Sequence, residues 1–275
     1  MTEPLLSVRN ITKRFGGLIA VNNVSCEINH GEVVGLLGDN GAGKSTLIKC
    51  ISGVYHADEG EMFFEGQRAH FSHPIDARRN GVETIYQDLA LANNLDVGAN
   101  IFLGREVKKR RLAGLIKTLD DEHMLRESRR TLDSLHIHFP SLTEPIESLS
   151  GGQRQAVAIA RAVYWDAKLM IMDEPTNNLG VPEQQKVLEL IRELRERGVP
   201  VILITHTLPD AFAVTDRLIV MHRGRKVAEK VTAETNMEEL VQYMVGARDD
   251  TNKGVPSPQR EIGSRGRCEE QDAGR

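Results

Sequence analysis

The sequence predicts an α/β fold built on a mainly parallel sheet. Short β-branched runs alternate with stretches of helical periodicity, as expected when helices connect successive parallel strands. Several of these runs are apolar at nearly every position, as strands covered by helices on both faces should be. The 275 residues suffice for one large domain or two small ones. The strand candidates are residues 32–37, 82–86, 168–172, 201–205 and 218–221.

The clearest helix is predicted over residues 182–197. Pro182 suits the first turn of this helix, and Gly198 stands where a C-terminal cap belongs. Its polar face is rich in Glu and Arg, so that face should be solvated. Apolar residues recur along the other face at helical spacing: Val187, Leu188, Ile191 and Leu194.

The pattern changes over residues 88–150, which are polar and helix-favouring and contain no good strand. We interpret this segment as a helical insertion in the α/β domain. Its basic run REVKKRR, residues 105–111, has no interleaved aromatic side chains. A solvated surface is therefore a better interpretation than a nucleic-acid patch, and no nucleic-acid partner is expected.

Composition limits the class of protein further. The net charge of −4 gives no general attraction to nucleic acid or anionic lipid. No apolar segment approaches the roughly 20 residues of a membrane-spanning helix, and residues 1–4 lack the basic start of a signal peptide. Residues 249–275 carry almost no apolar side chains, which predicts a disordered tail. Any work at a membrane is therefore expected to need a partner.

The three cysteines, Cys26, Cys50 and Cys268, lie far apart in the sequence and show no CxxC spacing. They cannot all pair within the chain. A reducing, cytosolic location is the better interpretation.

The first strand candidate runs into a complete GxxxxGK[ST] motif, followed by a helix-compatible segment. Its glycines let backbone N–H groups curl around phosphate oxygens, and the helix N-terminus adds a positive field. Lys44 is then expected on the β- and γ-phosphates, with the Ser45 hydroxyl on Mg²⁺. The motif indicates a P-loop nucleoside triphosphatase. The residues expected to hold the nucleotide here are Gly38, Asp39, Asn40, Gly41, Ala42, Gly43, Lys44, Ser45 and Thr46.

Two acids, Asp173 and Glu174, follow directly after an apolar strand candidate. Alone, such a pair is more often a helix cap or a surface salt bridge. With a phosphate loop in the same chain, we assign Asp173 to the metal ion and Glu174 to the attacking water, as its general base or positioner.

The segment LSGGQ opens a second helix, whose apolar face includes Ala156 and Ile159. Two glycines and a serine at a helix N-terminus form a cradle for an anion, although they are also ordinary capping residues. The candidate ligand-binding residues are Ser150, Gly151, Gly152 and Gln153.

In combination, the phosphate loop, LSGGQ, the acid pair in IMDEP and the histidine in ILITH resemble the nucleotide-binding subunit of an ABC transporter. The order and spacing match over about residues 5–246. The resemblance implies an ATP-binding cassette over this range, with a RecA-like core, an antiparallel β portion at its N-terminus and the helical insertion. The tail matches nothing in the family.

The resemblance also implies roles for three residues that would otherwise pass as structural. Phe15 in KRFGG matches the aromatic residue that stacks on adenine, whereas a lone Phe beside a strand is usually core. Gln87 in TIYQD matches the glutamine that touches Mg²⁺ or the water and senses the membrane partner. His206 in ILITH matches the histidine that bonds the γ-phosphate, although a strand-end His is most often structural.

Family membership further implies a head-to-tail homodimer, in which the LSGGQ of one subunit closes over the ATP of the other. The implied partners are permease subunits in the membrane and, indirectly, a periplasmic sugar-binding protein. The subunit itself would be peripheral on the cytoplasmic face of the inner membrane.

Several segments look most like monosaccharide importers of the ribose, xylose and fructose group: LGDNGAGKSTLIK, ETIYQDLALANNLDVGANIFLGRE and GGQRQAVAIARAV. The single set of motifs resembles the single-cassette, fructose-type members. The alternatives are an ABC-type ATPase acting on DNA or ribosomes, which usually has a long coiled coil or two cassettes, and a regulatory module without hydrolysis. Retention of Glu174 and His206 argues against the regulatory module without hydrolysis.

Residues 177–180 depart from the family pattern. Most members continue the acid pair with Ser-Ala-Leu-Asp, and that aspartate helps the two active sites communicate. This chain has Asn-Asn-Leu-Gly. Monosaccharide importers often lack the acid, so Gly180 fits that branch, whereas Asn177 and Asn178 are less usual there.

Overall fold

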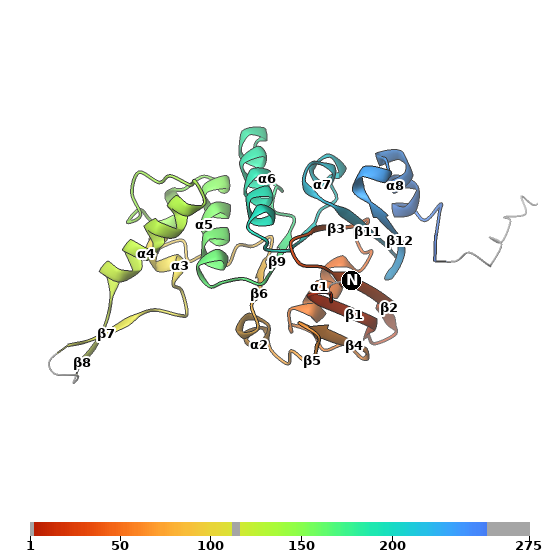
Figure 1. Cartoon of the computed structure of the whole chain (residues 1–275), viewed down its shortest axis with the longest axis horizontal. Coiled ribbons are helices and arrows are strands. Elements are labelled where there is room, and N and C mark those ends of the chain that lie inside the picture. Colours follow the sequence, from red (N-terminus) through yellow and green to blue (C-terminus); the bar gives the residue numbers. More distant parts are fainter. Residues whose placement is uncertain (1–2, 112–115, 252–275) are drawn as a thin grey trace, which may run out of the picture.

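The computed structural model describes residues 3–111 and 116–251, arranged around a six-stranded sheet (Figure 1). Five neighbouring strands of this sheet are parallel, and β12 pairs antiparallel with β11 at one edge. In spatial order the strands are β12 (Arg225–Val231), β11 (Arg217–His222), β3 (Val33–Leu37), β10 (Val201–Ile204), β9 (Leu169–Asp173) and β6 (Val82–Ile85). All five strand candidates of the sequence are strands of this sheet, with ends shifted by at most one residue.

Alternate residues of the parallel strands pack into different core clusters on the two faces of the sheet. In β9, Met170 and Met172 belong to the core on the helical side, whereas Leu169 and Ile171 belong to the core that includes the N-terminal strands. Successive side chains on a strand point to opposite faces. An apolar run is therefore what a strand buried on both faces requires.

A second sheet, entirely antiparallel, comes from the N-terminal part of the chain and confirms that prediction. Helix α1 (Lys44–Ile51) packs beside it, because Leu47 and Ile48 share one core with residues of both sheets. The strands of this sheet are, in spatial order, β2 (Leu18–Ile28), β1 (Leu6–Phe15), β4 (Glu59–Phe64) and β5 (Gln67–Ala69).

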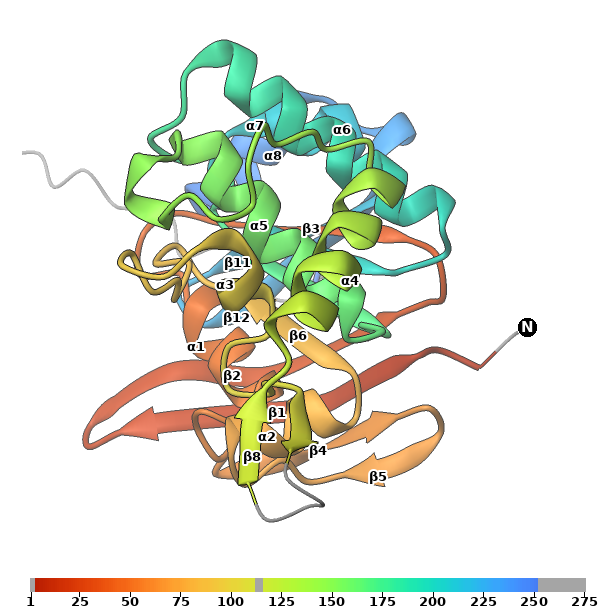
Figure 2. The same cartoon turned by 90° about the vertical axis from the view of Figure 1, so that its left-hand side faces the viewer.

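A helical region lies to one side of the sheets (Figures 1 and 2). Its core residues, among them Ile101, Leu132 and Val157, are almost completely buried. Its elements are α3 (Val97–Ile101), α4 (Asp121–Ser134), the 3-10 helix Ile146–Ser148 and α5 (Gly151–Tyr164). The remaining helices are α2 (Pro74–Arg79), α6 (Val181–Glu196), α7 (Leu208–Val214), the 3-10 helix Thr232–Glu234 and α8 (Met237–Met244).

The prediction that the inserted segment contains no strand is wrong. Strands β7 (Lys108–Arg111) and β8 (Ile116–Leu119) pair antiparallel and project from the helical region (Figure 1). The basic run has no apolar alternation, so no period-2 signal marks it as a strand. Cross-strand pairing forms the ribbon instead, and a salt bridge of 3.0 Å between Lys109 Nζ and Asp120 Oδ1 supports it.

The expectation that residues 105–111 form only a solvated surface needs a correction at Arg105. Its guanidinium donates to Glu83 Oε1 at 2.8 Å and lies 4.7 Å from the ring centroid of Trp165. Arg105 therefore ties the ribbon region to β6 and to the C-terminal end of α5.

The predicted helix over 182–197 is confirmed as α6, which Gly198 follows at φ 77°. The predicted tail begins too early at 249, because Asp250 donates its backbone N–H to Val227 O at 2.9 Å. Residues 252–275, on which the disorder prediction mainly falls, lie outside the described residues. Within the described ranges, no helix has the length and apolar character needed to cross a membrane.

Cys26 and Cys50 are both buried free thiols, and Cys268 lies outside the described residues. Burial raises the pKa of both thiols to about 11. Because the thiolate is the reactive form, both residues behave as core side chains.

Candidate functional site

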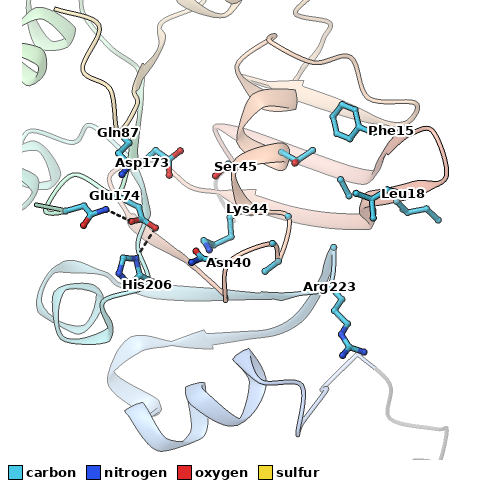
Figure 3. A pocket seen from close by; sticks show the side chains of 18 residues that line it. Phe15, Leu18, Asn40, Lys44, Ser45, Gln87, Asp173, Glu174, His206 and Arg223 are labelled. Atoms are coloured by element: carbon cyan, nitrogen blue, oxygen red, sulfur yellow. Dashed lines mark hydrogen bonds and ion pairs between the residues drawn. The ribbon is translucent and has the colours of Figure 1, made fainter.

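A cavity of about 760 Å³ opens at the carboxyl ends of the parallel strands. Figure 3 shows Gln87, Asp173, Glu174 and His206 on one side of it and Phe15 on the other, with Lys44 between them. Ligands of open α/β sheets characteristically bind at this edge. Chain topology therefore collects these side chains from five different segments.

The phosphate loop folds around the start of α1. Gly43 is the N-cap residue of this helix, with φ 100° and no side-chain capping bond, so α1 directs its first backbone N–H groups toward the cavity. A Cβ on Gly43 would lie 2.4 Å from Ala20 O, and one on Gly38 would lie 2.4 Å from Met221 O. Only glycine fits at both positions.

Lys44 is 6% exposed and crosses the loop. Its ammonium donates to Gly38 O at 2.8 Å and to Asp39 O at 3.1 Å. Burial lowers the pKa of Lys44, while the negative charges of Glu174 and Asp173 oppose the shift. The residue is thus a buried cation held beside two acids.

The predicted loop residues divide into two groups. Residues 40–46 line the cavity, whereas Gly38 and Asp39 do not line it and accept hydrogen bonds from Lys44 through their carbonyls. The β11–β12 turn supports the loop, because Gly224 donates its N–H to Ala42 O at 2.9 Å.

Asp173 is the last residue of β9 and points into the cavity (Figure 3). Burial raises the pKa of its carboxyl group, and the charge of Glu174 raises it further. Lys44 and Lys49 act in the opposite direction. A bound cation would relieve the unfavourable interaction of this half-buried carboxylate.

Three oxygen-bearing residues of the cavity fit a divalent cation: Ser45, Gln87 and Asp173 all line it. A hydroxyl, an amide carbonyl and a carboxylate are hard ligands of the kind that Mg²⁺ prefers. The donor set therefore suits the ion that accompanies nucleoside triphosphates.

Glu174 is held by two neighbouring side chains. His206, which follows β10, has Nδ1 3.0 Å from Glu174 Oε1. Asn177 donates from Nδ2 to Glu174 Oε2 at 3.1 Å. The Glu174 backbone is also fixed, with φ 51° and an N–H bond to Ile204 O of 2.9 Å. Both carboxylate oxygens thus have a partner.

Phe15 lies at the opposite end of the cavity, 43% exposed at the end of β1. Its ring meets Tyr55 edge-on with centroids 5.2 Å apart, and Lys13 Nζ lies 5.5 Å from its centroid. Leu18 and Ile19 at the start of β2 are exposed beside it. Together they form an apolar surface suited to a planar base.

Sequence reasoning missed several residues that line the cavity: Leu18, Ile19, Ala20, Asn177, Arg223 and Gly224. Leu18 and Ile19 could have been suspected, because two apolar residues directly follow a turn after Phe15. The β11–β12 turn carries no local signal and reaches the cavity only through tertiary packing. Asn177 stood out in the sequence only as a departure from the family pattern.

The LSGGQ residues do not join this cavity. Ser150 and Gln153 cap each other at the start of α5, with Ser150 N–H donating to Gln153 Oε1 at 2.9 Å. Ser150, Gly152 and Gln153 line a separate cavity of about 610 Å³, beside Glu183 of α6. Gly151 lines a further cleft, shared with Gln87 and Asn177. None of the four LSGGQ residues Ser150, Gly151, Gly152 and Gln153 therefore lines the cavity of the phosphate loop in its own chain.

A glycine-rich loop around a helix N-terminus, with its lysine and a strand-end acid pair, defines a P-loop nucleoside triphosphatase. The family model described as ABC transporter matches residues 21–177. The chain belongs to the ABC transporter family. ATP is the nucleotide that the cassettes of this family bind and hydrolyse, so the chain is an ATPase.

Solved structures of the family share the fold. A nucleotide-free ATP-binding cassette from an ABC transporter is 28% identical with a TM-score of 0.72, covering 88% of this chain and 95% of the other. A dimeric ATP-binding cassette in a post-hydrolysis state, bound to ADP and phosphate, is 25% identical with a TM-score of 0.68. That alignment covers 82% of this chain and 98% of the other.

Two curated relatives are similar along most of their length. The xylose/arabinose import ATP-binding protein of Sulfolobus acidocaldarius is 51% identical over 240 residues, covering 87% of this chain and 93% of the relative. The fructose import ATP-binding protein of Rhizobium meliloti is 41% identical over 255 residues, covering 92% and 98%.

Proposed function

We propose that this chain is the subunit that couples ATP hydrolysis to the import of a monosaccharide through a membrane permease. The observation that carries the proposal is one cavity that unites the phosphate loop, the acid pair, Gln87 and His206 in a chain 51% identical to a sugar-import ATPase. The name of the fructose relative supports the same class of substrate.

ATP would lie with its base on Phe15, Leu18 and Ile19 and its phosphates at the start of α1. The apolar end of the cavity provides a surface for the base, and the loop provides backbone donors for the phosphates. Lys44, already buried beside the loop, would exchange its two carbonyl acceptors for the β- and γ-phosphates.

Mg²⁺ would be held by Ser45, Gln87 and Asp173. When bound, the ion neutralises charge on the β- and γ-phosphates. Asp173 is the last residue of β9 and lines the cavity, and Gln87 reaches the cavity from the end of β6. Because Gln87 also lines the cleft beside the start of α5, it is suited to transmit permease contacts to the site.

Glu174 would orient the attacking water and accept its proton. His206 would bond the γ-phosphate, and its contact of 3.0 Å with Glu174 places the two groups together. In-line phosphoryl transfer needs little covalent help, so the positioning of these charges supplies most of the catalysis.

The complete site would require two copies of the chain arranged head to tail. Ser150, Gly151, Gly152 and Gln153 would close over ATP bound by the partner, since none of them lines the phosphate cavity of its own chain. The dimeric solved cassette provides a precedent for association of such chains.

The proposed partners are permease subunits and, through them, a periplasmic sugar-binding protein. The subunit would then work as a peripheral protein on the cytoplasmic face of the inner membrane. ATP-driven closure of the dimer would change the conformation of the permease, and this change would couple ATP hydrolysis to transport.

Co-purification with the permease, followed by reconstitution, tests this function. We expect ATPase activity to rise several-fold when a sugar-loaded binding protein is added, and uptake of that sugar to follow. Glu174→Gln should retain ATP, accumulate an ATP-bound dimer and stop both turnover and uptake. Near-normal hydrolysis in Glu174→Gln would refute the role of Glu174. Activation by DNA or ribosomes, without permease binding, would refute the transport function.

A further inference from the structure

Asn177 lines the phosphate cavity, and its side chain contacts Glu174 directly. Its Nδ2 donates to Glu174 Oε2 at 3.1 Å, while His206 Nδ1 lies 3.0 Å from the other oxygen, Oε1. One carboxylate is thus held from two sides by residues that follow different strands, β9 and β10.

The backbone between Glu174 and Asn177 is fixed in place. Asn177 N–H bonds Glu174 O at 3.1 Å and closes a tight turn. Within this turn, Thr176 Oγ1 donates to Asp210 Oδ2 of α7 at 2.7 Å, and both side chains are buried. The amide of Asn177 therefore projects from an anchored turn.

The Asn177 amide and the His206 imidazole differ in how their ability to donate a hydrogen bond depends on protonation. An Asn side chain donates through Nδ2 at every physiological pH, whereas a His nitrogen donates or accepts according to its tautomer and charge. If His206 turns to the γ-phosphate during transfer, Asn177 still holds the second oxygen of Glu174.

We propose that Asn177 is a positioning residue for Glu174, fixing the carboxylate in the orientation needed to act on the attacking water. This inference rests on the proposed role of Glu174. Without the Asn177 donor, the Glu174 side chain gains rotamers in which it faces away from the water. A hydrogen bond donated to a carboxylate is stronger than one between neutral groups. Because Asn177 donates to Glu174, loss of this hydrogen bond should slow turnover more than it weakens ATP binding.

The test compares Asn177→Ala and the isosteric Asn177→Asp with the wild-type chain in steady-state ATPase assays and nucleotide binding. We expect kcat to fall by about 10-fold in Asn177→Ala and at least as far in Asn177→Asp, which places an acceptor against Glu174. KM and the ATP dissociation constant should stay within about twofold. Asn177→Gln, which retains the amide, should recover part of kcat.

Asn178→Gly is the matched control. Asn178 is the next residue, is exposed, has φ 60° that glycine adopts freely, and makes no side-chain hydrogen bond within the described chain. Its kcat should match the wild type. An equal fall in Asn178→Gly would mean that the loop as a whole matters, and would overturn the specific role of Asn177.

Glu174→Gln separates this inference from the proposed function. If Glu174→Gln hydrolyses ATP normally, the role of Glu174 itself fails. If Glu174→Gln is inactive while Asn177→Ala and Asn177→Asp keep wild-type kcat, only the positioning role fails. The double variant Asn177→Ala/Glu174→Gln should be no slower than Glu174→Gln alone, because no carboxylate remains to be oriented.

Discussion

Adjacent acids Asp173 and Glu174 occupy different environments although they share a strand end. Asp173 closes β9 and carries a pKa raised by burial and by the neighbouring charge. Glu174 has turned into the left-handed region at φ 51° and accepts hydrogen bonds from the next segment. The ionised form of the Asp173 carboxylate is therefore disfavoured in the absence of a metal ion. The Glu174 carboxylate, in contrast, is held by His206 and Asn177.

Replacing Asp173 by Asn should stabilise the nucleotide-free and Mg²⁺-free chain. Because folding raises the pKa of Asp173, its ionised form costs free energy, and the stability that wild-type Asp173 contributes falls as pH rises through that pKa. We expect Asp173→Asn to be more stable than the wild type at neutral pH. The difference should vanish as pH falls and the wild-type carboxyl group becomes neutral.

Urea unfolding at a series of pH values measures this effect, with Glu189→Gln on the exposed face of α6 as control. The control should show little change at any pH. Equal or lower stability of Asp173→Asn at neutral pH would contradict the electrostatic account of this site. The same variant should lose ATPase activity, so stability and function change in opposite directions.

At the residue scale, the sequence predicts what local motifs encode. The phosphate loop is contiguous, so Lys44 and Ser45 follow from spacing alone, and the structure places both in the cavity. Arg223 reaches the same cavity from a turn between two strands far along the chain. Nothing in its neighbouring residues signals this position, because only the packing of the two sheets creates it.

At the scale of elements, the buried parallel strands were predictable because burial on both faces leaves a strong apolar run. The ribbon formed by β7 and β8 was not, since its strands are held by pairing with each other and by salt bridges such as Lys109 to Asp120. Such polar pairing produces no hydrophobic period. Strands that are buried on both faces can thus be predicted from sequence more readily than polar strands that are held only by pairing with each other.

A buried amide ties helix α3 to the loop that precedes it. Asn100 is 0% exposed, donates to the carbonyls of Ala92, Leu95 and Asp96, and accepts the Ala92 N–H at 2.7 Å. These bonds shape the loop that connects the segment containing Gln87 to α3. Burial without such partners would leave several backbone groups unsatisfied.

Asn100→Ala should therefore destabilise the chain by about 3 kcal/mol, because the backbone partners of the amide remain buried and unsatisfied. The midpoint of urea unfolding measures the loss. Asn80→Ala is the matched control: this exposed amide makes one bond, to Asp76 O at 2.8 Å, and its loss should cost about 0.5 kcal/mol or less. Similar losses in the two variants would show that the Asn100 amide does not organise the loop.

At the scale of the whole molecule, the N-termini of α1 and α5 line different cavities. The start of α1 lines the phosphate cavity, whereas Ser150 at the start of α5 lines a cavity with Glu183. Gly151 is packed against the segment that follows Glu174, since a Cβ there would lie 2.7 Å from Leu179 Cδ2. The phosphate loop and the LSGGQ residues of one copy therefore line separate cavities.

Mixing two inactive variants tests whether two copies complete each other. In a head-to-tail dimer, Lys44→Ala disables the phosphate loop and Ser150→Arg disables the cradle, so each homodimer has two damaged sites. The heterodimer concentrates both lesions in one site and leaves the other intact. With random pairing in a closed twofold dimer, half of the dimers are mixed, and hydrolysis should recover to about a quarter of the wild-type value. Differently tagged subunits would report ATP-dependent heterodimers in the same samples. If mixing yields neither heterodimers nor hydrolysis above that of the separate variants, Ser150 does not act on the nucleotide of a second copy.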